Sequence, residues 1–168
     1  MKAVMISIQP KWCEKIAGGE KTIEVRKTRP KLEPPFKCYI YRTKGSVKHL
    51  INDKWVNVAV GGTVIGEFVC DCIEEHHQHI HAPINELEEV ELFTVLELSC
   101  LTYPELANYT KNQEHYKPFY GWLISDLVLY DKPKELGEFK VRKTNDVWSC
   151  LKRLERPPQS WCYVEEGD

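Results

Sequence analysis

Short apolar stretches broken by glycine and proline most strongly constrain what this sequence can fold into. Residues 1–9 alternate as a strand does, and residues 10–18 have the spacing of a short helix. A proline suits the first position of that helix, and the pair Gly18-Gly19 suits a left-handed helix end. The pattern predicts a strand, a short helix and a return strand over residues 20–27.

Strand-like segments continue along the chain without the regular rhythm of parallel βαβ units. Gly66 lies inside one of them and indicates a bulge. The predicted elements are strands at 36–42, 62–73 and 160–165, a hairpin within 44–60 that turns at Asn52-Asp53, a strand at 119–130 closed by Asp131 and Pro133, and helices at 102–110 and 146–153. Many strands with few short helices favour an α+β fold that is mostly β, or a β-barrel.

Composition is consistent with a globular protein. The chain has 168 residues, 42% of them hydrophobic, which suits a single domain over residues 1–168 with a sizeable core. No apolar run approaches the roughly 20 residues of a membrane-spanning helix, and the first residues do not resemble a secretory signal, so we expect a cytoplasmic protein without a membrane partner.

Seven cysteines, an odd number without a C-x-x-C pair, favour reduced and mostly buried thiols. P-loop, G-x-S-x-G and dinucleotide-binding motifs are missing from the sequence, and no cofactor is predicted.

Charge is divided unevenly along the chain. Residues 1–56 hold 13 Lys and Arg against 5 Asp and Glu, a net of +8, whereas residues 57–115 hold 1 against 11, a net of −10. Clustered charge of one sign can attract an anionic ligand. Alternatively, the fold interleaves these segments and the asymmetry disappears in space.

The octet G-E-K-T-I-E-V-R at residues 19–26 concentrates charge around two aliphatic residues. On a strand, Thr22, Glu24 and Arg26 share one face, and the aliphatic pair shares the other. Lys21 comes at the junction of helix and strand, where the pleat does not determine its direction. These side chains could line a cleft in which Arg26 contacts phosphate or a base edge and Glu24 accepts from an exocyclic amine. The alternative is an exposed strand with weak cross-strand ion pairs.

The segment S-I-Q-P-K-W-C-E-K-I-A-G-G-E-K-T-I-E-V-R resembles the start of an ASCH domain, a family of the PUA-like β-barrel superfamily. Its signature G-x-K-x-x-E-x-R is complete here as Gly19, Lys21, Glu24 and Arg26. The resemblance continues through G-T-V-I-G-E-F-V, L-T-Y-P-E-L-A-N-Y, Y-G-W-L-I-S-D-L and P-P-Q-S-W-C-Y-V-E, and so spans nearly the whole chain. These later segments are similar to those of phage and bacterial ASCH proteins.

The resemblance implies a small PUA-like β-barrel with short flanking helices and a cleft for RNA or a nucleotide-like ligand. Some bacterial relatives are amidohydrolases of acetylated cytidine, in which the lysine matching Lys21 is catalytic and a threonine nucleophile matches position 24. This chain has Glu24 there, with Thr22 two residues away. Other relatives are ribonucleases.

Four further residues are candidates for ligand contacts. Ser7 and Gln9 end the first strand beside a helix N-terminus, which can bind an anion, although Gln9 could instead cap the helix. Arg42 ends a strand and is a candidate phosphate contact or a solvated strand end. Trp122 belongs to a strand of the resemblance and could stack on a base, although most aromatic residues are core.

The run C-D-C-I-E-E-H-H-Q-H-I-H (70–81) is a weaker candidate, for metal. Cys70 and Cys72 would share a strand face, as would His77 and His79, but the spacings are not those of usual zinc sites. An exposed strand end is the alternative.

Three hypotheses follow. The first is a module that binds RNA or a modified nucleoside in a basic cleft. The second is a hydrolase, either an amidohydrolase on a modified base or a ribonuclease, that uses Lys21 and Glu24. The third is a protein that binds a partner through its acidic middle segment. The sequence leaves the oligomeric state open.

Overall fold

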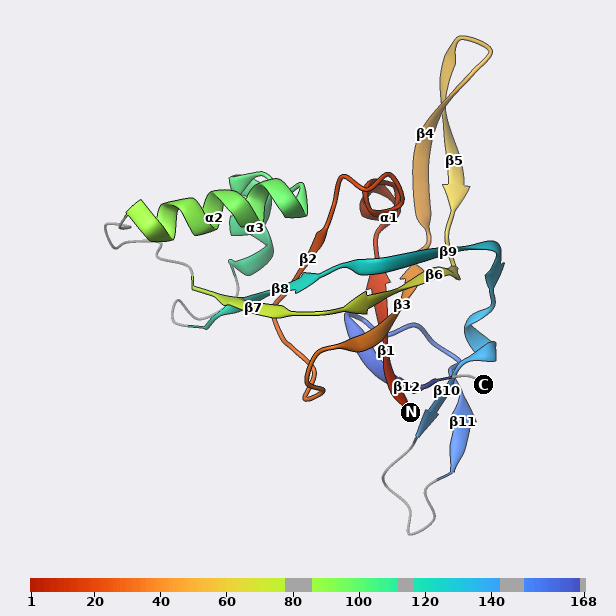
Figure 1. The fold of residues 1–168 in the computed structure, drawn as a ribbon. Coiled ribbons are helices and arrows are strands. Elements are labelled where there is room, and N and C mark those ends of the chain that lie inside the picture. Colours follow the sequence, from red (N-terminus) through yellow and green to blue (C-terminus); the bar gives the residue numbers. More distant parts are fainter. Residues whose placement is uncertain (78–85, 112–116, 143–149, 167–168) are drawn as a thin grey trace.

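The computed structural model describes residues 1–77, 86–111, 117–142 and 150–166, which form an open, β-rich α+β fold (Figure 1). Its strands are β1 (Lys2–Ile8), β2 (Ile23–Arg26), β3 (Phe36–Arg42), β4 (Gly45–Ile51), β5 (Lys54–Val60), β6 (Thr63–Cys70), β7 (Ile73–His76), β8 (Phe119–Leu123), β9 (Ser125–Lys134), β10 (Lys140–Arg142), β11 (Leu151–Arg153) and β12 (Trp161–Glu165). Its helices are α1 (Pro10–Ala17), α2 (Glu86–Ser99), α3 (Tyr103–Thr110) and the 3₁₀ turn Leu136–Glu138.

A seven-stranded sheet in the order β11-β10-β12-β1-β3-β6-β9 forms the centre of the fold. β1 pairs parallel with β3 and antiparallel with β12. Val4, Ile6 and Ile8 pack into one hydrophobic cluster, and Ala3 and Met5 pack into a second. Both faces of β1 are therefore covered, which explains why its sequence is apolar at nearly every position.

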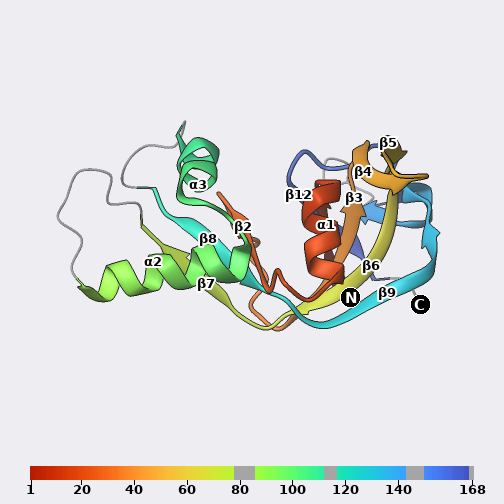
Figure 2. The same ribbon diagram turned by 90° about the horizontal axis from the view of Figure 1, so that it is seen from above.

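A second sheet, β2-β8-β7, is covered by the helices α2 and α3 (Figure 2). Ile23 and Val25 of β2 lie in a cluster with Val95, Leu106 and Phe119. The aliphatic pair of the octet faces the core, as the alternation predicts. The opposite face of β2 carries Glu24 and Arg26.

The first helix agrees with the sequence. α1 begins at Pro10, and Gln9 occupies the N-cap position without a hydrogen bond from its side chain. Gly19 alone of the two glycines is left-handed, with φ of +75°, whereas Gly18 has φ of −78°. The chain then reaches β2 only at Ile23, so Lys21 lies before the strand and is free of its pleat.

Two turn features are confirmed. β4 and β5 pair from Gly45↔Val60 to Ile51↔Lys54, and both turn residues, Asn52 and Asp53, have positive φ. At Gly66 the register between β6 and β9 shifts, and a Cβ there would lie 2.4 Å from the carbonyl oxygen of Val128. Glycine is needed at that position because the neighbouring backbone approaches so closely.

Several predicted boundaries are wrong. The predicted strand 119–130 is divided between β8 and β9, which belong to different sheets. β9 continues through Pro133 to Lys134. Proline has no backbone N–H to donate, and it is tolerated here because β9 is an edge strand. Leu151–Arg153 is a strand and not the end of a helix, while the earlier part of that predicted helix, 146–149, lies outside the described residues. The predicted strand 62–73 ends at Cys70, and a separate strand begins at Ile73.

Candidate functional site

The charged residues of the octet are buried together. Lys21, Glu24 and Arg26 retain only 3%, 6% and 8% of their exposed surface. Burial of three charges is costly unless each is paired, so the partners of these groups determine what the site can do. This burial excludes the alternative of an exposed strand with weak surface ion pairs.

Lys21 is held by three acceptors. Its Nζ donates to the carbonyl oxygens of Ile23 and Ser99 at 2.8 Å each. The same atom lies 3.2 Å from Glu24 Oε2. Two of the three ammonium protons are thus hydrogen-bonded, and the contact with Glu24 is electrostatic. Lys21 thereby links the start of β2 to the C-terminal end of α2.

Glu24 lies between the two cations. Its Oε1 is 3.0 Å from an Arg26 terminal nitrogen, and its Oε2 is 3.2 Å from Lys21 Nζ. Oε2 is nevertheless buried without a hydrogen bond, because the Lys21 contact is an ion pair of poor hydrogen-bond direction. This oxygen is therefore an unsatisfied acceptor that is closed to solvent.

Arg26 joins the strand β2 to β1 and to the C-terminal segment. One terminal nitrogen donates to the carbonyl oxygen of Ser7 at 2.6 Å, and the other donates to Ser160 Oγ at 3.4 Å. Its Nε is buried and has no hydrogen-bond partner in the structure. A free donor on Arg26 and a free acceptor on Glu24 therefore belong to the same buried cluster.

The cluster lies at a cleft of about 740 Å³. This volume is in the range of small-molecule binding sites. Elements distant in sequence contribute to it: β1, α1, β2, α3 and the segment before β12. The lining includes Ser7, Gln9, Lys11, Trp12, Lys21, Glu24, Arg26, Lys27, Thr28, Thr43, Glu105, Asn108, Tyr109, Gln159 and Ser160.

Two aromatic side chains line the cleft. Trp12 of α1 lies beneath Lys11, whose Nζ is 4.0 Å from the ring centroid. Tyr109 of α3 lies beneath Lys27, whose Nζ is 5.0 Å from the ring centroid. Burial raises the pKa of Tyr109, while the charge of Arg26 acts in the opposite direction. The phenol therefore stays protonated at neutral pH and can donate a hydrogen bond.

The cleft retains part of the charge asymmetry of the sequence. Its cations Lys11, Lys21, Arg26 and Lys27 all come from the basic first third of the chain. The acidic segment contributes Glu105, which pairs with Lys11 at 3.0 Å. The asymmetry is thus retained locally as an excess of cations around one cleft.

The other predicted ligand residues are placed differently from one another. Ser7 and Gln9 line the cleft, although the Ser7 hydroxyl already donates to the carbonyl oxygen of Pro158 at 2.6 Å. Thr22 and Arg42 are not among the lining residues. Thr22 instead exchanges backbone hydrogen bonds with Leu98 and Ile124.

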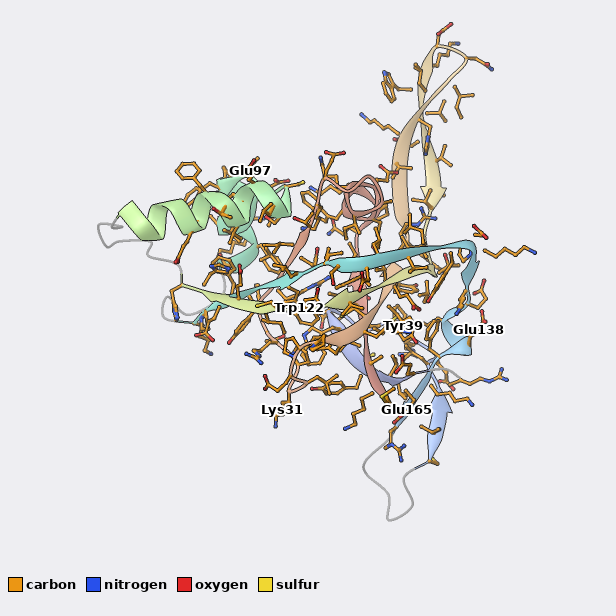
Figure 3. All side chains as sticks on the ribbon, viewed as in Figure 1. Lys31, Tyr39, Glu97, Trp122, Glu138 and Glu165 are labelled. Atoms are coloured by element: carbon orange, nitrogen blue, oxygen red, sulfur yellow. The ribbon has the colours of Figure 1, made fainter. Side chains whose placement is uncertain are left out.

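Trp122 requires a correction. It has no exposed surface and lies in the core, at the centre of the molecule in Figure 3. Its ring contacts Phe36 and Trp161, with centroids 6.0 Å from each. Because the opposite residue on β2 is Glu24, Trp122 supports the strand that carries the cluster and offers no face for stacking. Trp12 and Tyr109 are the aromatic residues that the sequence reasoning missed.

The metal candidates do not converge in the described residues. Cys70 is buried and its thiol lies 3.4 Å from the carbonyl oxygen of Cys72, which is exposed, so the two do not share a face as predicted. His77 lies 3.3 Å from Glu75, and His79 falls outside the described residues. No group of three or more His, Cys, Asp or Glu within those residues is placed to bind a metal ion.

The cysteines are all free thiols. Cys13, Cys38 and Cys70 are buried, and Cys72 and Cys150 are exposed, so burial is less general than the sequence suggested. Burial, reinforced by the charge of Glu24, raises the pKa of Cys13 to about 12. This thiol beneath the cluster is therefore protonated and is not a nucleophile.

Comparison with solved structures shows the fold. The crystal structure of ASCH from Zymomonas mobilis superposes with a TM-score of 0.59 and 18% identity, covering 98% of this chain and 88% of that one. Two single-residue mutants of the same protein give TM-scores of 0.61 and 0.62 at 18% and 17% identity, with 92% and 89% of their chains covered and 99% and 98% of this one. This chain has the ASCH fold.

The ASCH fold suggested by the sequence resemblance is therefore confirmed over almost the whole chain, as an open, β-rich α+β arrangement. No protein-family model and no curated protein matches the sequence. Among the described helices of this ASCH fold, none has the length and apolar character needed to cross a bilayer.

Proposed function

We propose that the protein binds RNA or a modified nucleoside in the cleft above Lys21, Glu24 and Arg26. The observation that carries this proposal is the pair of unused groups in a buried charged cluster, the acceptor Glu24 Oε2 and the donor Arg26 Nε. Structural ion pairs usually satisfy their hydrogen-bonding capacity when buried. Both atoms are closed to solvent in this structure, so a base edge that offers one N–H and one acceptor would complete them once the lining of the cleft shifts to admit it.

The walls of the cleft fit the rest of such a ligand. Trp12 and Tyr109 provide aromatic faces on which a base can stack. Lys27 and Lys11 lie at the same aromatic side chains, where they would attract phosphate and add electrostatic steering. Stacking and base-edge hydrogen bonds would then provide selectivity among nucleosides.

The cluster favours binding over hydrolysis. An amidohydrolase of the kind that the resemblance suggests needs a hydroxyl at position 24, where this chain has a carboxylate. Thr22 supplies no substitute because it does not line the cleft. Lys21 donates to two backbone carbonyls and forms an ion pair with Glu24, so action as a base would require it to give up these contacts.

Binding can be tested with a panel of nucleosides, including N4-acetylcytidine, and short single-stranded RNAs. A ligand should raise the midpoint of thermal unfolding, and titration calorimetry should give its affinity. Glu24→Gln and Arg26→Lys should weaken binding. Lys27→Gln serves as a rim variant that leaves the buried cluster intact and should reduce the salt dependence of RNA binding.

Chromatography of the same mixtures separates a binding module from an enzyme. The ligand should be recovered unchanged after incubation with the protein. Deacetylated nucleoside or cleaved RNA that disappears with Lys21→Ala would establish the hydrolase instead. Absence of binding by any nucleoside or RNA at low salt would refute both and leave the acidic segment as the better candidate for a partner surface.

A further inference from the structure

The hairpin β4–β5 is an arm that extends away from the body of the fold (Figure 1). Its two strands pair with each other and with no other described strand. Val47 is its single buried residue. An isolated two-stranded hairpin is only marginally stable in water, so the arm would be stabilised by contact with a ligand or partner.

The register of the arm determines which side chains share a face. Leu50 lies opposite Trp55, and Lys48 lies opposite Asn57, so these four side chains are on one face. Trp55 is 70% exposed and Leu50 is 57% exposed. Tryptophan rarely stays this exposed, and an exposed tryptophan beside an exposed leucine on an arm indicates a contact surface.

The character of the face indicates what it contacts. Residues 44–60 contain Lys44, Lys48 and Lys54 but one acidic residue, Asp53. A cation, a flat aromatic ring and an amide on one face are the groups that bind phosphate, base face and base edge in single-stranded nucleic acid. The tip of the arm is Asn52-Asp53, a polar turn that does not suit insertion into a lipid surface.

The base of the arm adjoins the candidate cleft. Thr43 lines the cleft, and β4 begins two residues later at Gly45. Gly45 packs on the ring of Pro10, the first residue of α1, which also provides Trp12 to the cleft. Gly45 shares its face of the arm with Val47, so the face that carries Lys48 and Trp55 points away from Pro10 at the base of the arm. A strand of seven residues extends about 23 Å, so an RNA that leaves the cleft passes the edge of the arm to reach Trp55.

We propose that the β4–β5 arm is a second RNA contact, in which Trp55 stacks on a base and Lys48 pairs with phosphate. This inference rests on the proposed function. It specifies the ligand as a single-stranded RNA that places one nucleoside in the cleft and continues along the arm, and not as a free nucleoside.

The test compares labelled single-stranded RNAs of about 4 and about 16 nucleotides by fluorescence anisotropy. Trp55→Ala should weaken binding of the longer RNA by about 5- to 150-fold and leave the shorter RNA and nucleosides unaffected. Trp55→Phe should restore most of the affinity because it restores an aromatic face. Lys48→Gln should reduce the slope of log affinity against log salt by about 0.7.

Val56→Ala is the matched control because Val56 pairs with His49 on the opposite face of the same arm. It should leave RNA binding unchanged. Equal affinity of Trp55→Ala and the wild type for the longer RNA, with weakened binding by Arg26→Lys, would refute the arm contact and keep the cleft. Failure of the wild type to bind any RNA would refute both. Trp55-dependent binding to phosphatidylserine vesicles with unchanged RNA affinity would assign the arm to a lipid surface and overturn the proposal.

Discussion

Replacing Lys21 with methionine tests whether the buried cluster is a coupled unit. The variant keeps most of the apolar length of the side chain but removes two hydrogen bonds of 2.8 Å to backbone carbonyls and an ion pair of 3.2 Å. Glu24 would retain Arg26 as its cationic partner. Removal of one member of a buried ion pair typically costs about 3–5 kcal/mol because the other charge stays buried.

This cost should be visible in unfolding experiments. At about 2–4 °C per kcal/mol for a chain of this length, Lys21→Met should lower the midpoint of thermal unfolding by about 6–20 °C. Urea unfolding should show the same loss with an unchanged m-value. Lys15→Met is the matched control, because Lys15 forms an exposed ion pair with Glu20 at 2.8 Å. Equal effects of the two variants would refute the view that burial makes Lys21 structurally important.

The same reasoning predicts a different result for removal of all three charges. Lys21→Met, Glu24→Leu and Arg26→Met together leave no uncompensated charge, and buried ion clusters replaced by apolar residues are often neutral or stabilising. The triple variant should therefore be more stable than Lys21→Met alone and should bind no nucleoside. Such a result would show that the cluster is retained for the ligand and not for stability.

Three further predictions concern other parts of the fold. Gly66→Ala should cost about 1–3 kcal/mol in urea unfolding because its Cβ would meet the Val128 carbonyl oxygen, whereas Gly137→Ala, with open space around it, should not. The pKa of Glu105 is lowered from 4.5 to about 2, first by the backbone N–H of Thr102 and then by Lys11. Its contribution to stability is therefore present above pH 4.5 and is lost as the pH falls toward 2. In Glu105→Gln, the free energy of unfolding should depend less on pH over this range. Tyr109→Ala should weaken nucleoside binding in calorimetry by about 5- to 150-fold, and Tyr109→Phe should weaken it less because it keeps the stacking face.

Local patterns were sufficient to predict much of the fold. Alternation identified β1, proline and glycine delimited α1, and Asn52-Asp53 identified the turn of the hairpin. Each of these signals acts within a few residues, where backbone preference and burial agree. The helix α2 was not predicted although Leu92, Val95 and Leu96 have helical spacing, because the acidic residues around them were interpreted as charge and not as the exposed side of a helix.

The cleft was predictable in part. The parity of β2 correctly separated Ile23 and Val25 from Glu24 and Arg26. Parity could not determine which elements cover the polar face, since Ser160 meets Arg26 across 134 positions of sequence. No local signal distinguishes an aromatic residue that lines a cleft, such as Trp12, from one in the core. Trp122 shows the converse error, because a matched strand indicated importance but not exposure.

Position 24 connects the fold to the proposed function. A threonine there would leave Lys21 and Arg26 without a shared carboxylate, and both cations would then need another anion. Glu24 satisfies them internally and leaves one oxygen, Oε2, without a hydrogen bond. Because Glu24 already neutralises these cations, an anionic ligand group beside them would add less binding energy than a neutral hydrogen-bond donor such as an exocyclic amine. In the RNA complex that we propose, phosphate recognition would fall to Lys11, Lys27 and the arm, and base selection would fall to the cleft.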